Sequence, residues 1–364
     1  MSNPKPTTSL STSTTGARLL KHVLAAESRI RKHIRTTPLE ACPWLSKLAG
    51  PSTRVFLKCE SEQATGSFKL RGAFAKLTAL IEAAEHQATL PRQADSDQNV
   101  LVLPRIVTAS TGNHALACCA AMQSLGISGT ICVPSSITRA KRERLELMRA
   151  KLIVGGRECL DAENAAQELA QRSGAVYVSP YNDWDVAGGN GTVAVDLVVH
   201  QGLHNVDAVF VAVGGGGLIG GMAAFLKALV PNVRIVGCSP MQSCVMVRSV
   251  EAGRIVDEAE DSETLSDGTA GGIEPGSLTF DVCRDLVDEW VTVSEVEIAR
   301  AMRFMLEYHH RVVEGAAGVA IAAFRKHAQR FAGQTVAIVL CGSNVSMNHV
   351  AQVSSDVDLD LDMN

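Results

Sequence analysis

The stretch AVFVAVGGGGLIGG, residues 208–221, joins an apolar, β-branched run to four glycines and then to a helical pattern that continues to Leu229. Such a run, followed at once by a glycine turn and a helix, is typical of a buried parallel strand that enters a crossover helix. Glycines let several backbone N–H groups converge on one anion, and the dipole of the following helix adds to the attraction. We interpret Gly214 to Gly217 as a phosphate site. The alternative is a turn that only lets helix and strand pack closely.

The same alternation of strand and helix extends along most of the chain. The predicted strands are residues 55–59, 106–109, 130–133, 152–154, 175–178, 208–213, 234–238 and 335–340, and the predicted helices are 17–34, 115–124, 139–149, 162–171, 218–229, 295–308 and 316–327. Strands that alternate with helices form right-handed crossovers and mostly parallel sheets covered on both faces. The expected fold class is therefore α/β.

Composition excludes several classes of function. The chain has 364 residues, of which 46% are hydrophobic and 20% charged, so we expect about two globular domains. The net charge of −4 and the lack of a long basic run argue against a nucleic-acid partner, and no apolar window is long enough to predict a membrane span. Ten cysteines without a CxxC pair predict buried thiols in a reducing compartment, so we expect a cytoplasmic protein.

Three further motifs follow predicted strands. In SFKLRG (67–72), Lys69 stands at a loop-to-helix junction, where a lysine is usually a solvated helix-start residue. In TASTGNH (108–114), hydroxyls and free N–H groups at a helix start can hold a carboxylate or phosphate; the alternative is a capped helix with His114 on the surface. In LCGSN (340–344), the thiol of Cys341 can hydrogen-bond a heterocycle nitrogen, or it is a buried structural cysteine.

Taken together in chain order (67–72, 108–114, 214–217 and 340–344), the four motifs resemble the fold-type II pyridoxal phosphate enzymes, in particular the serine/threonine dehydratase and serine racemase branch. The resemblance extends from about Leu39 to Val350. Supporting matches are Lys58-Cys59-Glu60, Ser179-Pro180-Tyr181-Asn182, Gly189-Asn190-Gly191-Thr192, Ser266-Asp267-Gly268 and Glu314-Gly315-Ala316-Ala317-Gly318. The resemblance implies the tryptophan synthase β-like architecture, with two domains that each contain a mostly parallel sheet flanked by helices.

The resemblance also implies which residues hold the cofactor, pyridoxal 5'-phosphate. Lys69 would bond to the cofactor aldehyde, and Phe68 would lie beside the ring. Asn113 would hydrogen-bond the ring hydroxyl, and Gly214, Gly215, Gly216 and Gly217 would hold the phosphate. Cys341 would face the pyridine nitrogen.

The substrate residues are implied in the same way. Ser110, Thr111 and the neighbouring amides would bind the substrate carboxylate, with Gly112, His114 and Tyr181 close to the substrate. We expect Lys69, together with Ser110 and Thr111, to take part in catalysis.

The expected reaction is loss of water and ammonia from a β-hydroxy amino acid such as L-threonine or L-serine. A neutral Cys341 cannot keep the pyridine nitrogen fully protonated as an aspartate would, and the resulting weaker electron sink favours elimination. In the expected mechanism, Lys69 removes the α-proton and the phosphate held by Gly214 to Gly217 helps to protonate the departing hydroxyl. The products are a 2-oxo acid and ammonia.

Two departures from the racemase pattern bear on these expectations. Where metal-dependent relatives have Glu-Pro, this chain has Ser239-Pro240, and the companion acidic position is Val245, so a divalent metal is left open. Where racemases place a serine, this chain has Thr111, which keeps a hydroxyl.

The domain boundaries follow from the resemblance and from composition. We expect a disordered tail at residues 1–16, a large cofactor-binding domain made of 17–104 and 183–350, a small domain at 105–182 and an acidic tail at 351–364. Residues 85–99 are strongly polar and predict a surface loop.

Four alternatives remain open. Within the same cofactor class, the chain could be an amino-acid racemase, a 3-hydroxyaspartate dehydratase or, less in keeping with its lysine motif, a sulfide-using β-replacement enzyme. From another class, it could be a catalytically silent binding protein that kept the fold, although the presence of Lys69 argues against this. We expect a small-molecule amino-acid substrate and a homodimer.

Overall fold

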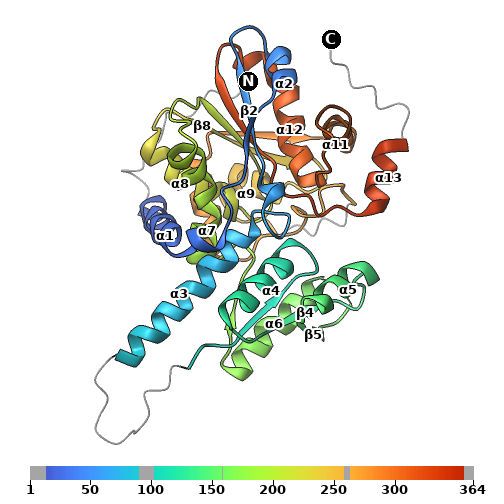
Figure 1. Cartoon of the computed structure of the whole chain (residues 1–364). Helices are drawn as coiled ribbons and strands as arrows, with labels where there is room; N and C mark the ends of the chain where they lie inside the picture. Colours follow the sequence, from blue (N-terminus) through green and yellow to red (C-terminus); the bar gives the residue numbers. More distant parts are fainter. Residues whose placement is uncertain (1–13, 90–101, 158, 258–262, 356–364) are drawn as a thin grey trace, which may run out of the picture.

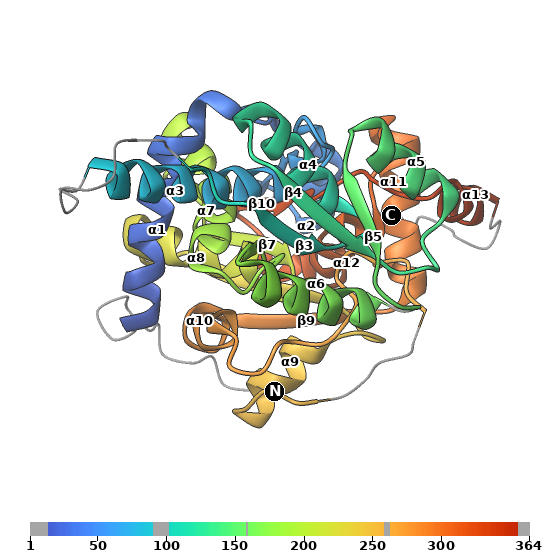
Figure 2. The same ribbon diagram turned by 90° about the horizontal axis from the view of Figure 1, so that it is seen from below.

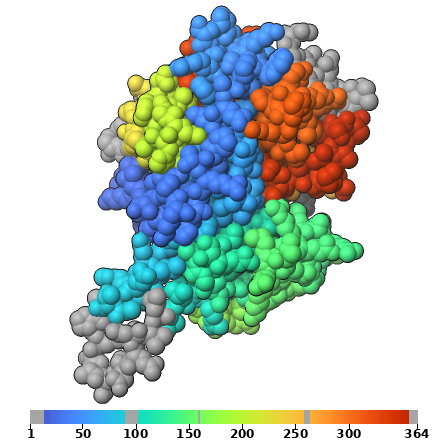
Figure 3. Space-filling view, viewed as in Figure 1, coloured from blue at the N-terminus to red at the C-terminus, as the bar shows by residue number. Residues whose placement is uncertain are grey.

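The computed structural model describes residues 14–89, 102–157, 159–257 and 263–355. They form two lobes, each built on one sheet (Figure 1). The small lobe, teal and green in Figure 3, lies directly against the larger one. Among the described residues, no helix has both the length and the apolar character needed to cross a membrane.

The large lobe contains a six-stranded sheet in the order β1-β2-β10-β7-β8-β9. Its strands are β1 (Leu39–Ala41), β2 (Arg54–Lys58), β7 (Ala208–Ala212), β8 (Arg234–Pro240), β9 (Glu289–Val293) and β10 (Thr335–Val339). Only β1 is antiparallel to its neighbour; the other pairs are parallel. Strands β2, β10 and β7 therefore end at the same edge of the sheet.

The small lobe contains a four-stranded, fully parallel sheet in the order β5-β4-β3-β6. Its strands are β3 (Ile106–Ala109), β4 (Gly129–Val133), β5 (Lys151–Val154) and β6 (Val176–Tyr177). The α/β class and the parallel sheets predicted from the sequence are thus confirmed. All eight predicted strands are present. The two that were missed are β1, which has only three residues, and β9, whose sequence EWVTV mixes polar with apolar residues.

Helices cover both sheets (Figures 1 and 2). Their bounds are α1 (Thr14–Ile30), α2 (Pro43–Ala49), α3 (Lys69–Thr89), α4 (Asn113–Leu125), α5 (Arg139–Leu147), α6 (Cys159–Ser173), α7 (Trp184–Val195), α8 (Gly217–Leu229), α9 (Val245–Ala252), α10 (Leu278–Leu286), α11 (Glu295–His309), α12 (Gly315–His327) and α13 (Met347–Ser355). Helices α8 and α12 pack against β7 and β8 from opposite faces, and α3 packs against both α7 and α4. Helix α3 therefore connects the two lobes.

Helix α7 was not predicted, because its glycines are poor helix formers. The structure shows why they are tolerated. A Cβ added to Gly188, Gly189 or Gly191 would lie 2.8, 2.5 and 2.7 Å from backbone atoms of α1, α3 and α8, respectively. The glycines thus let three helices approach the α7 backbone, and this packing outweighs the low helix propensity.

Three expectations about polar segments need correction. The predicted loop at 85–99 begins as the last turn of α3, whose Glu, Gln and Ala residues favour a helix even where it is exposed; residues 90–101 lie outside the described part. Residues 14–16 of the expected N-terminal tail belong to α1, which begins at Thr14; residues 1–13 lie outside the described part. Residues 351–355 belong to α13, which buries Val353, and the acidic residues beyond them are not described.

Candidate active site

The site lies where the carboxyl ends of the parallel strands meet. The loop after β2 leads to Lys69, β10 leads to Cys341, and β7 leads to the glycine loop. From the small lobe, β3 leads to Ser110 and β6 leads to the segment around Pro180. This is the edge at which open parallel sheets bind ligands.

The start of α3 is tied to the end of β10. Ser67 forms an antiparallel bridge with Gly342, and the Phe68 N–H donates to the Cys341 carbonyl at 3.1 Å. These contacts fix the backbone immediately before Lys69.

The Lys69 amine points toward the small lobe. Its Nζ donates to the Pro180 carbonyl at 2.7 Å and lies 5.3 Å from the centre of the Phe68 ring. Burial lowers the pKa of Lys69 to about 8, although Glu314 and Cys341 oppose the shift electrostatically. A neutral amine, which is the nucleophilic and basic form, is therefore accessible near physiological pH.

A group of buried charges holds the first turn of α3 from the other side. The Arg71 guanidinium donates to both oxygens of Glu60 at 2.8 Å and also to Asp196, while Lys58 Nζ lies 3.3 Å from Asp196. All four side chains are fully buried. We call Lys58, Glu60, Arg71 and Asp196 the ion cluster.

The pKa values of the ion cluster reflect its charge pairing. Although burial opposes the charged forms, Glu60 and Asp196 raise the pKa of Arg71, and Arg71 with Lys58 lowers that of Asp196. For Lys58 burial outweighs its acidic neighbours, so its pKa is lowered. The cluster as a whole stabilises the Arg71 cation and the Asp196 anion.

The glycine loop caps helix α8. Gly216 is the N-cap residue and has φ +83°, a conformation that side chains rarely adopt. A Cβ on Gly215 would lie 2.4 Å from the Tyr181 ring, and the Gly215 carbonyl accepts from Thr279 Oγ1 at 2.6 Å. The first N–H groups of α8 have no intrahelical partner and are available to an anion. The loop therefore allows the Tyr181 ring to pack closely and also presents N–H groups that can bind an anion.

The turn between β3 and α4 brings Ser110, Thr111 and Gly112 beside the start of α4, each partly buried. Ser110 Oγ accepts from the Gly112 N–H at 3.1 Å. His114 is not a surface residue: it is buried, and its Nε2 donates to the Val178 carbonyl at 3.1 Å. Burial lowers the pKa of His114 to about 3, so its ring stays neutral.

Asn113 lies at the junction of the two lobes. Its Nδ2 donates to both carboxylate oxygens of Glu314 at 3.1 and 2.9 Å, and its Oδ1 accepts from Asn344 Nδ2. The Cys341 thiol donates to Glu314 Oε1 at 3.6 Å. We call Lys69, Asn113, Glu314 and Cys341 the reactive cluster.

Two acidic residues of this region were not identified as site residues from the sequence. Glu314 directly precedes α12. Its only sequence signal was its place in the segment Glu314-Gly315-Ala316-Ala317-Gly318, which matches the family pattern. Glu274 accepts from Ser179 Oγ at 3.1 Å and from Asn182 Nδ2 at 2.7 Å, and its N–H donates to Tyr181 Oη at 2.8 Å. Glu274 thus holds the segment that supplies the Lys69 contact and the ring against Gly215.

The residues present fit pyridoxal phosphate. Lys69 offers an amine that loses its proton near pH 8, and the α8 N-terminus offers N–H groups for a phosphate. Asn113 Nδ2 can offer an N–H to a ring oxygen. Burial raises the pKa of Cys341 well above its usual value, so it offers a neutral thiol.

The structure also describes the residues at the position where metal-dependent relatives carry a ligand. Ser239 is buried and its Oγ donates to the Val213 carbonyl at 3.2 Å. Val245 begins α9 and is buried. Its apolar side chain has no ligand atom to offer a metal.

Comparison with known proteins agrees with this geometry. The family model described as pyridoxal-phosphate dependent enzyme matches residues 30–342. The L-threonine ammonia-lyase of Thermotoga maritima is 34% identical over 334 residues, 92% of this chain and 77% of that protein.

Solved structures match over nearly the whole chain. The processed form of threonine deaminase isoform 2 from Solanum lycopersicum has a TM-score of 0.84 at 26% identity and covers 98% of this chain and 92% of its own. Serine racemase from Dictyostelium discoideum has a TM-score of 0.76 at 27% identity and covers 90% and 98%. The chain belongs to the family of pyridoxal-phosphate-dependent enzymes.

Proposed function

We propose that this protein is an ammonia-lyase that converts a β-hydroxy amino acid of the L-threonine or L-serine type to a 2-oxo acid and ammonia. The observation that carries the proposal is the Lys69 amine, which is held on Pro180 between the two lobes with its pKa lowered to about 8. The chain that carries this lysine is 34% identical to an L-threonine ammonia-lyase.

Different residues of the chain have different roles in the proposed reaction. Bound pyridoxal phosphate supplies an aldehyde and an electron-accepting ring. The turn of Ser110, Thr111 and Gly112 holds the substrate carboxylate at the start of α4, and the glycine loop holds the phosphate. The neutral Lys69 amine would take the α-proton, and the β-hydroxyl would leave as water with a proton from the phosphate that the glycine loop holds. Hydrolysis by water would then give the 2-oxo acid and ammonia.

The Cys341 thiol favours elimination over prolonged carbanion chemistry. Because burial raises its pKa, it stays neutral and supplies no negative charge to hold a proton on the ring nitrogen. Racemisation is the second candidate, since the chain resembles a serine racemase in structure and Thr111 keeps a hydroxyl beside the site.

Product analysis separates these functions. The purified protein is supplied with pyridoxal phosphate and then with L-threonine, L-serine or L-3-hydroxyaspartate, while oxo acid, ammonia and the D-enantiomer are measured. Oxo acid and ammonia in equal amounts support the lyase and identify the side chain. The D-enantiomer without oxo acid would support a racemase, and cofactor binding without any product would support a silent relative.

We further propose a homodimer that resides in the cytoplasm. The nine described cysteines whose side chains are placed are free and buried, as expected in a reducing compartment. We also propose that residues 105–182 form the small domain, since they contain the whole four-stranded sheet. Size-exclusion chromatography with light scattering tests the dimer.

A further inference from the structure

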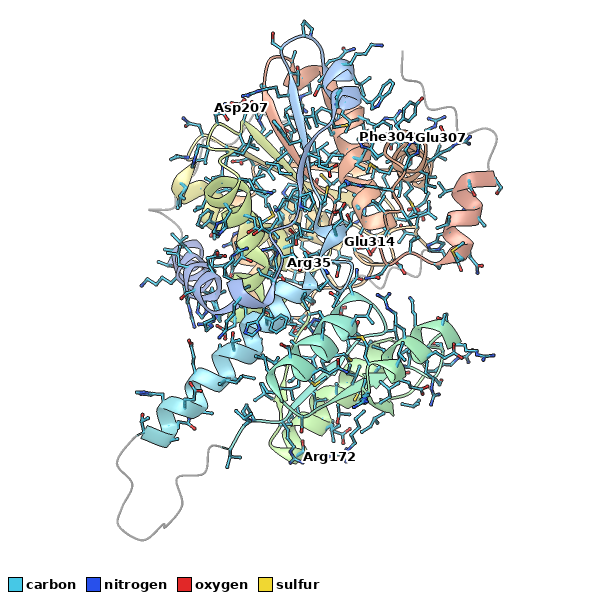
Figure 4. All side chains as sticks on the ribbon, viewed as in Figure 1. Arg35, Arg172, Asp207, Phe304, Glu307 and Glu314 are labelled. Carbon is cyan, nitrogen blue, oxygen red and sulfur yellow. The ribbon has the colours of Figure 1, made fainter. Side chains whose placement is uncertain are left out.

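Glu314 is a buried acid to which the proposed reaction assigns no role. It is the N-cap residue of α12, and its N–H donates to the Gly342 carbonyl at 3.1 Å. A Cβ on Gly342 would lie 2.4 Å from Glu314 Oε1, so the backbone of the segment after β10 confines the carboxyl group. Figure 4 shows Glu314 on the side of the large lobe that faces the small lobe, whereas Glu307 lies on the outside.

The contacts of Glu314 decide the orientation of the Asn113 amide. Because the carboxylate accepts hydrogen bonds only, the nitrogen of the amide must face Glu314. The oxygen of the amide faces Asn344, whose Nδ2 is also held by the Thr65 carbonyl at 2.9 Å. Asn113 Nδ2 contacts both oxygens of one carboxylate. Because an amide nitrogen carries two N–H groups, one of them can be shared between these oxygens while the other faces a ligand.

Protonation of Glu314 removes this preference. A carboxylic acid presents an O–H as well as an acceptor, and that O–H is satisfied by the amide oxygen rather than by the amide nitrogen. Burial raises the pKa of Glu314 to about 7, so both forms are populated around neutrality. The titratable groups that face Glu314 are Lys69 on α3, Cys341 after β10 and Asp267 in the loop before α10.

We propose that Glu314 is a positioning residue of the cofactor site: its carboxylate holds the Asn113 amide with one N–H directed at the ring oxygen of the cofactor, and protonation of Glu314 releases that amide. The proposal rests on the assignment of Asn113 within the proposed function. It acts in addition to any effect of pH on Lys69, because Glu314 acts through Asn113 on the ring oxygen, whereas Lys69 would bond to the aldehyde.

The test uses 4-deoxypyridoxine 5'-phosphate, which has the ring hydroxyl and the phosphate but no aldehyde to bond to Lys69. Its dissociation constant is measured for the wild type and for Glu314→Gln, near pH 6 and near pH 8. One lost hydrogen bond corresponds to about a tenfold weaker affinity. We expect Glu314→Gln to bind about tenfold more weakly than the wild type near pH 8 and about equally near pH 6.

Controls keep the test decisive. Glu307→Gln removes an outward-facing carboxylate on α11 and should bind as the wild type does at both pH values. Glu314→Asp, which keeps the charge, should restore part of the affinity near pH 8. Should Glu314→Gln not fold, Asn113→Ala serves instead, and the pH dependence of probe affinity that Glu314 causes should vanish.

The outcomes separate this inference from the proposed function. The same affinity ratio at both pH values would overturn the role of Glu314, even if the wild type releases oxo acid from L-threonine. A ratio that changes with pH in a protein without lyase activity would support Glu314 and overturn the proposed reaction instead.

Discussion

The ion cluster and the reactive cluster meet at the same helix start, and they differ in how far opposite charges offset the cost of burial. In the ion cluster, opposite charges meet at hydrogen-bond distance, and the pKa values of Arg71 and Asp196 move so as to keep both charged. In the reactive cluster, burial lowers the pKa of Lys69 and raises that of Glu314, so both move toward neutral forms.

The difference follows from whether each buried charged group contacts partners of opposite charge. Burial disfavours every charged form, and only close partners of opposite sign offset this cost. Arg71 has two carboxylates in contact, whereas the Lys69 amine contacts a carbonyl and Glu314 contacts an amide and a thiol. One cluster therefore holds the backbone in place, and the other keeps protons exchangeable near neutral pH.

The largest expected effect comes from removing the amine. Lys69→Ala should lower turnover of L-threonine or L-serine on the order of 1,000-fold, because it deletes the group that moves the α-proton. The measurement is release of oxo acid at saturating cofactor. Thermal unfolding is the control and should change little; wild-type turnover by this variant would refute the role of Lys69.

The next effect tests the ion cluster. Glu60→Ala leaves the buried Arg71 cation with one partner fewer, so we expect the free energy of unfolding to fall by about 3–5 kcal/mol. Urea denaturation of the apo-protein measures it. A loss below about 1 kcal/mol would show that the cluster is not held as tightly as its burial indicates.

A pH profile tests whether the Lys69 amine is buried as the structure shows. Only the neutral amine of Lys69 reacts with an aldehyde, so the rate at which apo-protein bonds pyridoxal phosphate should rise about tenfold per pH unit and level off above about pH 8. Stopped-flow absorbance follows the rate. A rise that continues toward pH 10 would mean that the amine is solvated like an ordinary lysine.

The smallest effect is expected for an exposed ion pair. Arg330 contacts Glu289 at 2.5 Å, but its side chain is half exposed, so Arg330→Ala should change the free energy of unfolding by no more than about 1 kcal/mol. The same urea assay applies. A loss comparable to that of Glu60→Ala would remove the distinction between buried and surface pairs.

The sequence predicts the repeating strands and helices well because each has its own local pattern. It misses α7, whose glycines oppose a helix until three neighbouring helices pack against them. It also misses the contacts that define the chemistry, since Pro180 lies 111 positions from Lys69 and Glu314 lies 201 from Asn113. No local pattern encodes a burial-dependent pKa shift that arises only when both lobes meet.

The central claim is that Lys69, and not a lysine of the ion cluster, carries the cofactor. Borohydride reduction of the protein loaded with pyridoxal phosphate fixes the bond between cofactor and lysine, and peptide mass spectrometry then locates it. We expect one cofactor per chain, on the peptide that contains Lys69. A cofactor fixed to Lys58 or to a surface lysine, with Lys69 unmodified, would contradict it.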